Sequence, residues 1–240
     1  MRYTLQVQYI GKNYAGSQIQ FENGIEIQTP TIQGELEKAI STLIFGDTEN
    51  NNRQLKTVFS GRTDRGVNSK GQIIHFDTDK PIVASKFVYQ LNEILPKDIS
   101  VSDLKQVDAS FHAQKSAKRR FYRYVFINRK CKNAFDGDLM RIKYDINIER
   151  MQNALNYLLG EHDFSSFKSS GTLNPSKVCF IEKAECKKDG DFVIIDIVGN
   201  RFLYNMVRTI VGTLLEIEGH NRSAEYMKQV LEACDRKKAG

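Results

Sequence analysis

The strongest constraint on the fold is the order of strand-like and helix-like segments, because that order occurs once and then nearly recurs. In the first half, alternating apolar residues predict strands, and apolar residues at helical spacing predict helices. The predicted strands are 3–9, 56–61, 71–78 and 99–104, and the predicted helices are 32–44, after the N-cap Thr31, and 87–95, before Pro96. The first half therefore has the order β-α-β-β-α-β.

The second half nearly repeats this order. Its predicted strands are 119–127, 177–186 and 191–199, and its predicted helices are 148–159, 201–219 and one after Ser223. Gly160 is expected to end the first helix, and Asp189-Gly190 is typical of a hairpin turn between the last two strands. A closing strand is missing, so we expect either that the sequence is truncated or that the protein does without this strand.

These patterns predict an α+β protein of two pseudo-repeated ferredoxin-like halves with antiparallel sheets, with helices on the outer faces and a central basic cleft. The predicted domains are 1–108 and 109–240, joined near residues 105–118. The chain has 240 residues, which is enough for one large core or two small ones.

Positive charge is concentrated between Ala109 and Phe135, where no acid occurs. Within this run, "RRFYRYVF" interleaves arginines with aromatic residues, and strand alternation places Phe121 and Arg123 on one face and Tyr122 and Tyr124 on the other. Phosphates need positive charge and unstacked bases need flat partners, so the pattern suits RNA. A solvated edge strand with its aromatic residues in the core explains the segment equally well. The formal net charge of +6 also favours a polyanionic partner.

Several classes of protein are disfavoured. No apolar stretch approaches the roughly 20 residues of a membrane span, and the alternating N-terminus is unlike a signal peptide. The four cysteines and four histidines lack metal-ligand spacing, and a nucleotide-binding P-loop is missing. We therefore expect a cytoplasmic protein with reduced thiols and without a metal site.

One acid, Asp64, lies in the loop "SGRTDRGV" between Arg62 and Arg65 and between two glycines. It is either a turn residue, because Asp and Gly form turns, or an ionised carboxylate presented to a substrate. Arg208 lies in a mostly apolar predicted helix, where a charge is costly unless it is paired, and Asp64 is the acid that we nominate as its partner. Tyr122 taken alone is better explained as a core residue.

Four segments in this order, "GRTDRGV", "FHAQKSAKRRFYRY", "LLGEHDFSSF" and "RFLYNMVRTIVGTLLEIEGH", resemble the tRNA pseudouridine synthase A family. The resemblance extends from about Tyr3 to Arg236. It implies the pseudouridine synthase fold and an isomerase that cuts the C1′–N1 bond of a uridine and rejoins the base through C5. It further implies action on the tRNA anticodon stem-loop, at positions 38, 39 and/or 40, by a homodimer without metal or organic cofactor.

The resemblance also implies roles for single residues. Asp64 matches the catalytic aspartate, Arg208 the arginine that pairs with it, Tyr122 the tyrosine that stacks on the extruded base, and Arg62 the arginine that helps to fill the space left by that base. Candidates for contacts with RNA are Lys118, Arg119, Arg120 and Arg123. Whether the carboxylate attacks sugar or base, or takes a proton, stays open.

The chain differs from many bacterial members near the loop. They carry an aromatic residue at Ser17, a small residue at Arg65 and a histidine at Asn68. Two alternatives to a tRNA enzyme are a paralogue that isomerises uridines in ribosomal RNA and a non-catalytic RNA-binding module.

Overall fold

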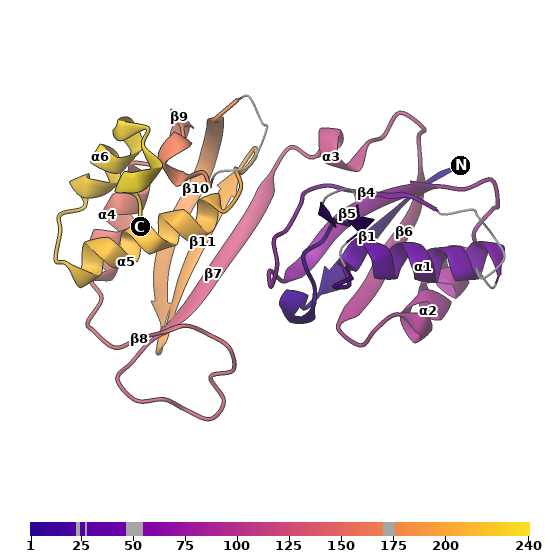
Figure 1. Cartoon of the computed structure of the whole chain (residues 1–240), viewed down its shortest axis with the longest axis horizontal. Helices are drawn as coiled ribbons and strands as arrows, with labels where there is room; N and C mark the ends of the chain where they lie inside the picture. Colours follow the sequence, from indigo (N-terminus) through magenta and orange to yellow (C-terminus); the bar gives the residue numbers. More distant parts are fainter. Residues whose placement is uncertain (23–24, 27, 47–54, 170–175) are drawn as a thin grey trace. The chain divides into compact units, whose positions relative to one another are not determined.

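The computed structural model describes residues 1–22, 25–26, 28–46, 55–169 and 176–240. The chain forms two compact units, Met1–Ala117 and Lys118–Gly240 (Figure 1). The predicted domain boundary after residue 108 falls inside the first of these units. The reason is that Arg2 donates hydrogen bonds to the carbonyls of Ala109 and Phe111, which fastens the connecting segment to the first sheet.

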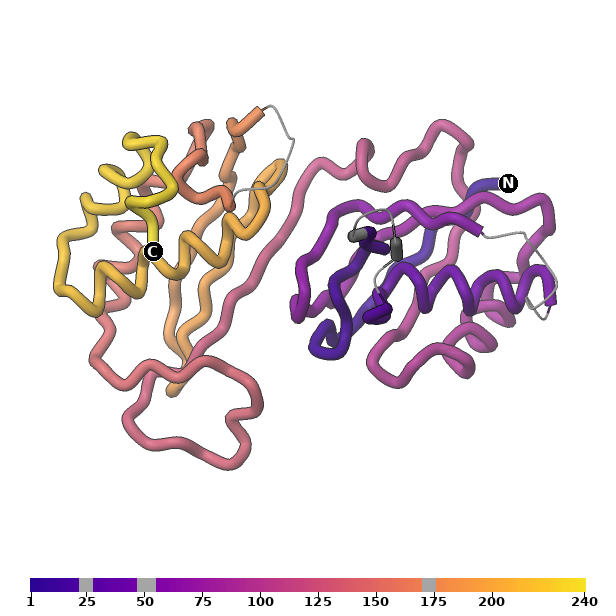
Figure 2. The backbone as a smooth tube through the Cα atoms, viewed as in Figure 1, coloured from indigo at the N-terminus to yellow at the C-terminus, as the bar shows by residue number. Residues whose placement is uncertain are grey.

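The first unit contains a four-stranded antiparallel sheet in the order β4-β5-β1-β6. Its main elements are β1 (Arg2–Tyr9), α1 (Ile32–Phe45), β4 (Thr57–Phe59), β5 (Ser69–Asp77), α2 (Ala84–Ile94) and β6 (Ile99–Val107). They follow one another in the β-α-β-β-α-β order that the sequence predicts. Short additional elements are η1 (Gly11–Asn13), β2 (Phe21–Glu22), β3 (Ile25–Glu26) and α3 (Ala113–Ser116). Figure 2 traces β1 through the middle of this sheet.

Both long helices of the first unit bury apolar side chains against the sheet. Alternate residues of β1, among them Leu5 and Val7, form one core cluster with Leu36 of α1 and Leu91 of α2. Thr31 caps α1 as predicted, because its side chain accepts a hydrogen bond from the Gly34 amide at 3.1 Å. The apolar face of the sheet and the apolar faces of the two helices thus pack together in a single core.

The second unit contains a five-stranded sheet in the order β8-β7-β11-β10-β9. Its elements are β7 (Arg120–Asn128), β8 (Arg141–Ile142), α4 (Ile148–Asn156), β9 (Gly160–Asp163), η3 (Ser165–Phe167), β10 (Val178–Asp189), β11 (Phe192–Gly199), α5 (Met206–Gly219), α6 (Glu225–Ala233) and η4 (Arg236–Lys238). The neighbours β7, β11 and β10 repeat the arrangement of β1, β5 and β4. In the described residues, the position that β6 takes beside β1 is taken beside β7 only by the two-residue strand β8.

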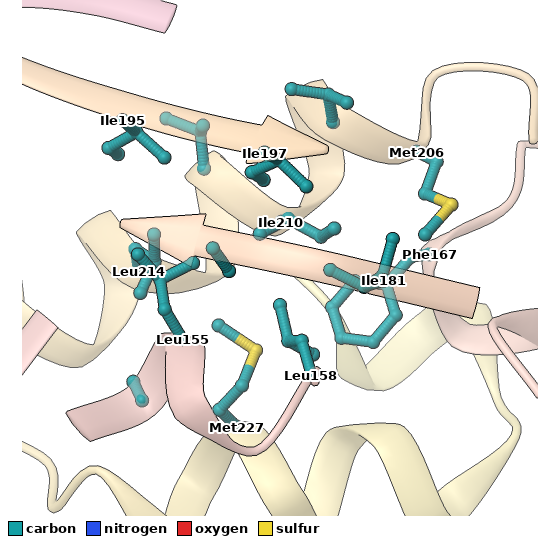
Figure 3. Packing of buried hydrophobic residues seen from close by; sticks show 14 of the residues in the cluster. Leu155, Leu158, Phe167, Ile181, Ile195, Ile197, Met206, Ile210, Leu214 and Met227 are labelled. Atoms are coloured by element: carbon teal, nitrogen blue, oxygen red, sulfur yellow. The ribbon is translucent and has the colours of Figure 1, made fainter. Parts of the chain in front are cut away.

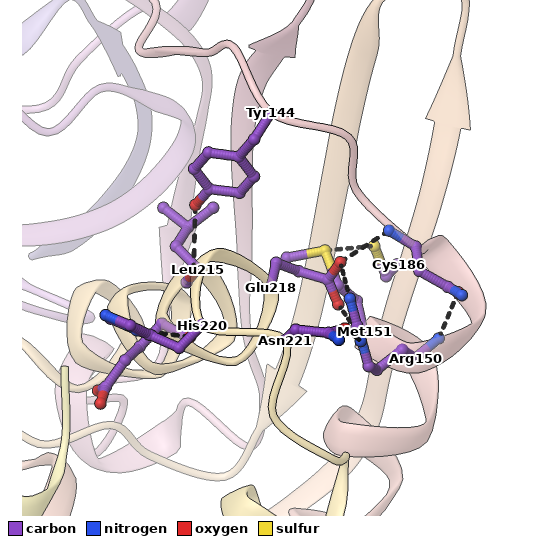
Figure 4. Close-up of polar contacts among 10 residues, drawn as sticks. Tyr144, Arg150, Met151, Cys186, Leu215, Glu218, His220 and Asn221 are labelled. Atoms are coloured by element: carbon purple, nitrogen blue, oxygen red, sulfur yellow. Dashed lines mark hydrogen bonds and ion pairs between the residues drawn. The ribbon is translucent and has the colours of Figure 1, made fainter.

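The core of the second unit lies between its sheet and the helices α4, α5 and α6 (Figure 3). Ile195 and Ile197 of β11 meet Ile210 and Leu214 of α5 in this layer. Arg150 at the start of α4 forms a partly buried ion pair with Glu218 near the end of α5, with 2.7 Å between Nε and Oε1 (Figure 4). The two helices are therefore fixed to each other by packing and by charge.

Three local predictions need correction. Gly160, with φ of +95°, begins β9 and does not cap a helix, because α4 already ends at Asn156. The predicted helix 201–219 begins only at Met206, because the preceding residue, Asn205, has a φ of +59° that interrupts helical geometry. The β10–β11 hairpin is confirmed, but its two turn residues are 190 and 191, and Gly190 supplies the positive φ of +57°.

No helix in the described part of the chain is long and apolar enough to cross a membrane.

Candidate active site

The loop that carries Asp64 connects β4 to β5 in the first unit. Its tip is a tight turn, because the Val67 amide donates a hydrogen bond to the Asp64 carbonyl at 3.1 Å. Gly66 is the third residue of this turn and has a φ of +78°, which a type II turn requires and glycine adopts without strain. The turn-forming interpretation of "TDRGV" is thus correct for the backbone, and it leaves the Asp64 side chain half-buried on a defined turn.

Both ends of the loop are attached to neighbouring strands and turns. At its start, Gln72 of β5 donates to the Gly61 carbonyl at 2.5 Å and accepts from the Ser60 hydroxyl at 2.6 Å. At its end, the Asn68 side chain accepts a hydrogen bond from the Gly11 amide at 2.8 Å. Arg62 and Arg65 lie on the loop with exposed side chains. The loop therefore has fixed ends and two exposed arginines beside a half-buried carboxylate.

Tyr122 lies on β7 in the second unit, opposite Ile197 of β11. Its half-buried ring packs against the hydrophobic core and meets the Phe202 ring edge-on, with 4.9 Å between centroids and an interplanar angle of 71°. The predicted alternation along β7 is confirmed, since Phe126 is fully buried on the same face while Phe121 is 58% exposed on the other. Tyr122 is thus packed against the core with part of its side chain, while another part stays exposed.

Arg208 lies in the first turn of α5, also in the second unit. Its side chain is exposed, whereas the neighbouring Val207 and Thr209 are buried. The core of the second unit therefore does not bury Arg208, because α5 buries only one side of its surface. The pairing of Arg208 with Asp64 stays a prediction.

The candidates for RNA contacts lie at the start of the second unit, and three of the four have partners within it. Arg119 forms an ion pair with Glu182 at 2.6 Å, and Arg120 donates a hydrogen bond to the Asn200 carbonyl. Arg123 forms a two-pronged pair with the buried Asp196, at 2.7 and 2.8 Å. Lys118 is exposed. The segment 118–123 is therefore basic and ordered, but ion pairs with Glu182 and Asp196 already compensate part of its charge.

Two features of the site escaped the sequence analysis. Phe202 contacts Tyr122, and its position in the motif "RFLYNM" is the only sequence signal for it. Asn205, with its positive φ, donates a hydrogen bond to the Ser169 hydroxyl at 3.1 Å and sets the start of α5. Within the described ranges, no cluster of three or more His, Cys, Asp or Glu side chains is arranged to hold a metal ion.

Comparison with known proteins identifies close relatives. A family model described as tRNA pseudouridine synthase matches residues 154–240. The tRNA pseudouridine synthase A of Anoxybacillus flavithermus is 42% identical over 236 residues, which is 98% of this chain and 90% of the relative. The protein of the same name from Halalkalibacterium halodurans is 41% identical over 240 residues, which is 100% of this chain and 87% of the relative. That from Francisella philomiragia is 37% identical over 238 residues, covering 99% and 87%.

Proposed function

The chain belongs to the tRNA pseudouridine synthase A family, and we propose on that basis that it isomerises uridine to pseudouridine in tRNA. The observation that carries this proposal is an identity of about two residues in five over nearly the whole of both chains. Such a match covers both units and both independent motifs, the Asp64 loop and the segment around Arg208.

The reaction is an isomerisation in which atoms and electrons balance. The C1′–N1 bond breaks, a C1′–C5 bond forms, and the proton that leaves C5 is matched by one gained at N1. We assign Asp64 as the catalytic carboxylate, which either forms a covalent intermediate or accepts a proton. Its half-buried position on a turn with attached ends supports this role, because a fixed group needs little reorganisation in the transition state.

The remaining site residues receive roles by the same resemblance. Tyr122 stacks on the extruded base, a role that its half-exposed ring and its contact with Phe202 support. Arg208 pairs with Asp64, and Arg62 helps to fill the space that the base leaves. The first unit thus supplies the catalytic loop, and the second supplies the stacking tyrosine and the pairing arginine.

Several finer properties belong to the same proposal. They are the ferredoxin-like pseudouridine synthase fold of both halves, action on the anticodon stem-loop, a homodimeric assembly and a place in the cytoplasm. The strand order of the first sheet supports the fold, and the free state of all four cysteines fits a reducing compartment.

Asp64→Asn tests the function directly. Asn serves the same turns as Asp, so a purely structural Asp64 predicts a nearly neutral change. An amide is neither a carboxylate nucleophile nor a base at neutral pH, so the catalytic role predicts loss of isomerisation with retained tRNA binding. The matched control is Asp79→Asn, at an exposed bend of the same unit.

The assay maps pseudouridines in RNA from cells that lack the gene and carry either variant. Loss of pseudouridine from the tRNA anticodon arm in Asp64→Asn but not in Asp79→Asn supports the proposal. A wild-type map in Asp64→Asn contradicts the catalytic role. Loss confined to ribosomal RNA favours the paralogue instead.

A further inference from the structure

The described main-chain hydrogen bonds of Thr63, the residue before Asp64, all join it to a single residue, Ser17. The Thr63 amide donates to the Ser17 hydroxyl oxygen at 2.8 Å. The Thr63 carbonyl accepts from the Ser17 amide at 3.0 Å and from the Ser17 hydroxyl at 3.4 Å. The Ser17 side chain is fully buried. One serine thus fixes the peptide groups on both sides of Thr63, including the one that leads into Asp64.

A further hydrogen bond holds the Thr63 side chain. Its hydroxyl lies 2.7 Å from the Tyr9 hydroxyl, and Tyr9 and Thr63 are 4% and 8% exposed. Burial raises the pKa of the Tyr9 phenol, so this group stays protonated and remains a hydrogen-bonding hydroxyl at neutral pH. Thr63 is therefore held through its amide, its carbonyl and its side chain.

The segment that carries Ser17 is itself anchored to the start of α1. The amides of Ile32 and Gln33 donate to the carbonyls of Gly16 and Ser17, at 3.2 and 3.0 Å. Gly16 pairs with Asp64 in an isolated antiparallel bridge, and a Cβ atom at Gly16 would lie 2.9 Å from the Thr63 carbonyl oxygen. A continuous set of main-chain contacts thus runs from α1 through Gly16 and Ser17 to the catalytic loop.

We propose that Ser17 is a positioning residue for Asp64, acting through the hydrogen bond from the Thr63 amide to its hydroxyl. This inference rests on the proposed function, in which Asp64 is the catalytic carboxylate. Removing the hydroxyl leaves a buried amide without an acceptor, which is unfavourable, and a shift of the loop relieves this cost. A shift of about 1 Å at a reacting group is enough to lower a rate roughly 100-fold.

The test compares Ser17→Ala with the matched variant Ser41→Ala. Ser41 is also a buried serine of the first unit whose hydroxyl accepts a main-chain hydrogen bond, from Leu55 at 3.4 Å, and its described side-chain hydrogen bond is not to the Asp64 loop. The measurements are the single-turnover rate constant on a tRNA transcript, the Kd for the same transcript, the Tm, and hydrogen exchange at the Thr63 amide.

We expect Ser17→Ala to lower the single-turnover rate roughly 10- to 100-fold. Its Kd for tRNA should stay within about twofold of the wild type, because the Ser17 side chain is fully buried and presents no surface to a ligand. Exchange at Thr63 should accelerate, and Ser41→Ala should lose a similar amount of Tm at a wild-type rate. Should Ser17→Ala not fold, Ser17→Cys gives the same test, because a thiol keeps the size and is only a weak acceptor.

A folded Ser17 variant with a wild-type single-turnover rate overturns the inference. Equal rate losses in the Ser17 and Ser41 variants also overturn it, because they show a general loss of stability. These outcomes are distinct from failure of the proposed function. The proposed function fails if the Asp64→Asn variant is active. If Asp64→Asn is inactive while Ser17→Ala is fully active, the function stands and only the positioning role falls.

Discussion

Replacing Glu218 with alanine should destabilise the second unit by roughly 3 kcal/mol. The Glu218 side chain has no exposed surface and accepts hydrogen bonds from Arg150 at two nitrogens and from the Asn147 amide (Figure 4). A hydrogen bond to a charged group contributes about 1.5 to 3 kcal/mol. The Arg150 side chain is 24% exposed, so water compensates part of the loss and the lower value of about 1.5 kcal/mol applies to each bond. The two hydrogen bonds from Arg150 together therefore give roughly 3 kcal/mol.

Glu216→Ala, two residues earlier on the same helix, is the matched control. Glu216 pairs with Arg222 at 3.0 Å, but the two side chains are 23% and 38% exposed. Exposed pairs contribute only about 0 to 1 kcal/mol. The assay is urea unfolding followed by pulsed thiol labelling of Cys186, which is buried in the second unit and therefore reports on that unit alone.

Equal destabilisation by Glu218→Ala and Glu216→Ala would refute the reasoning, because burial would then make no difference to the two pairs. The double variant Glu218→Ala/Arg150→Ala provides a second check. It should lose less stability than the sum of the single variants, because each single change removes the same two hydrogen bonds.

Three further predictions follow from other contacts. Tyr122→Phe should keep base stacking, whereas Tyr122→Ala should lose roughly 1 to 3 kcal/mol of it, measured as weaker tRNA binding and slower isomerisation; a fully active alanine variant would argue against the stacking role. The hydrogen bond from Arg123 holds the pKa of Asp196 below its usual range. This pair therefore stabilises the fold above about pH 4, and the stabilisation is lost as the pH falls through the lowered pKa of Asp196 in the folded protein. Asp196→Asn should therefore make Tm depend less on pH on the acid side. Burial raises the pKa of the Cys179 and Cys186 thiols to about 11, so peptide mapping after brief native labelling at neutral pH should find them unmodified. Reagent should be found on the exposed cysteines, Cys131 and Cys234.

Features that depend on local sequence were predictable. Alternation of side chains along β7 placed Tyr122 and Phe126 on the buried face, because a strand repeats every two residues whatever it packs against. The Thr31 cap and the end of α2 before Pro96 depend equally on neighbouring residues alone. The order of elements in the first unit followed from such local patterns.

Features that depend on distant residues were not predictable in this way. Ser17 is a short polar residue in an irregular segment, and its partner Thr63 lies 46 positions away, so periodicity contains no signal for the contact. The apolar composition of its segment does not place Arg208, because exposure within the second unit depends on which side of α5 faces the sheet. The strand β9 is not predictable from its own sequence either, because it has only four residues and forms by pairing with β10.

The central place of β1 has a consequence for how the protein folds during synthesis. β1 precedes both of its partners in the sequence, because β5 and β6 extend to Asp77 and Val107. Closure of the first sheet therefore waits for contacts of long sequence separation, which form slowly, whereas the β10–β11 hairpin of the second unit closes locally. The Asp64 loop is held by hydrogen bonds to Ser17, which lies between β1 and α1, and to Gln72 of β5. We therefore expect the loop to reach its described shape only after β1, α1 and β5 have come together.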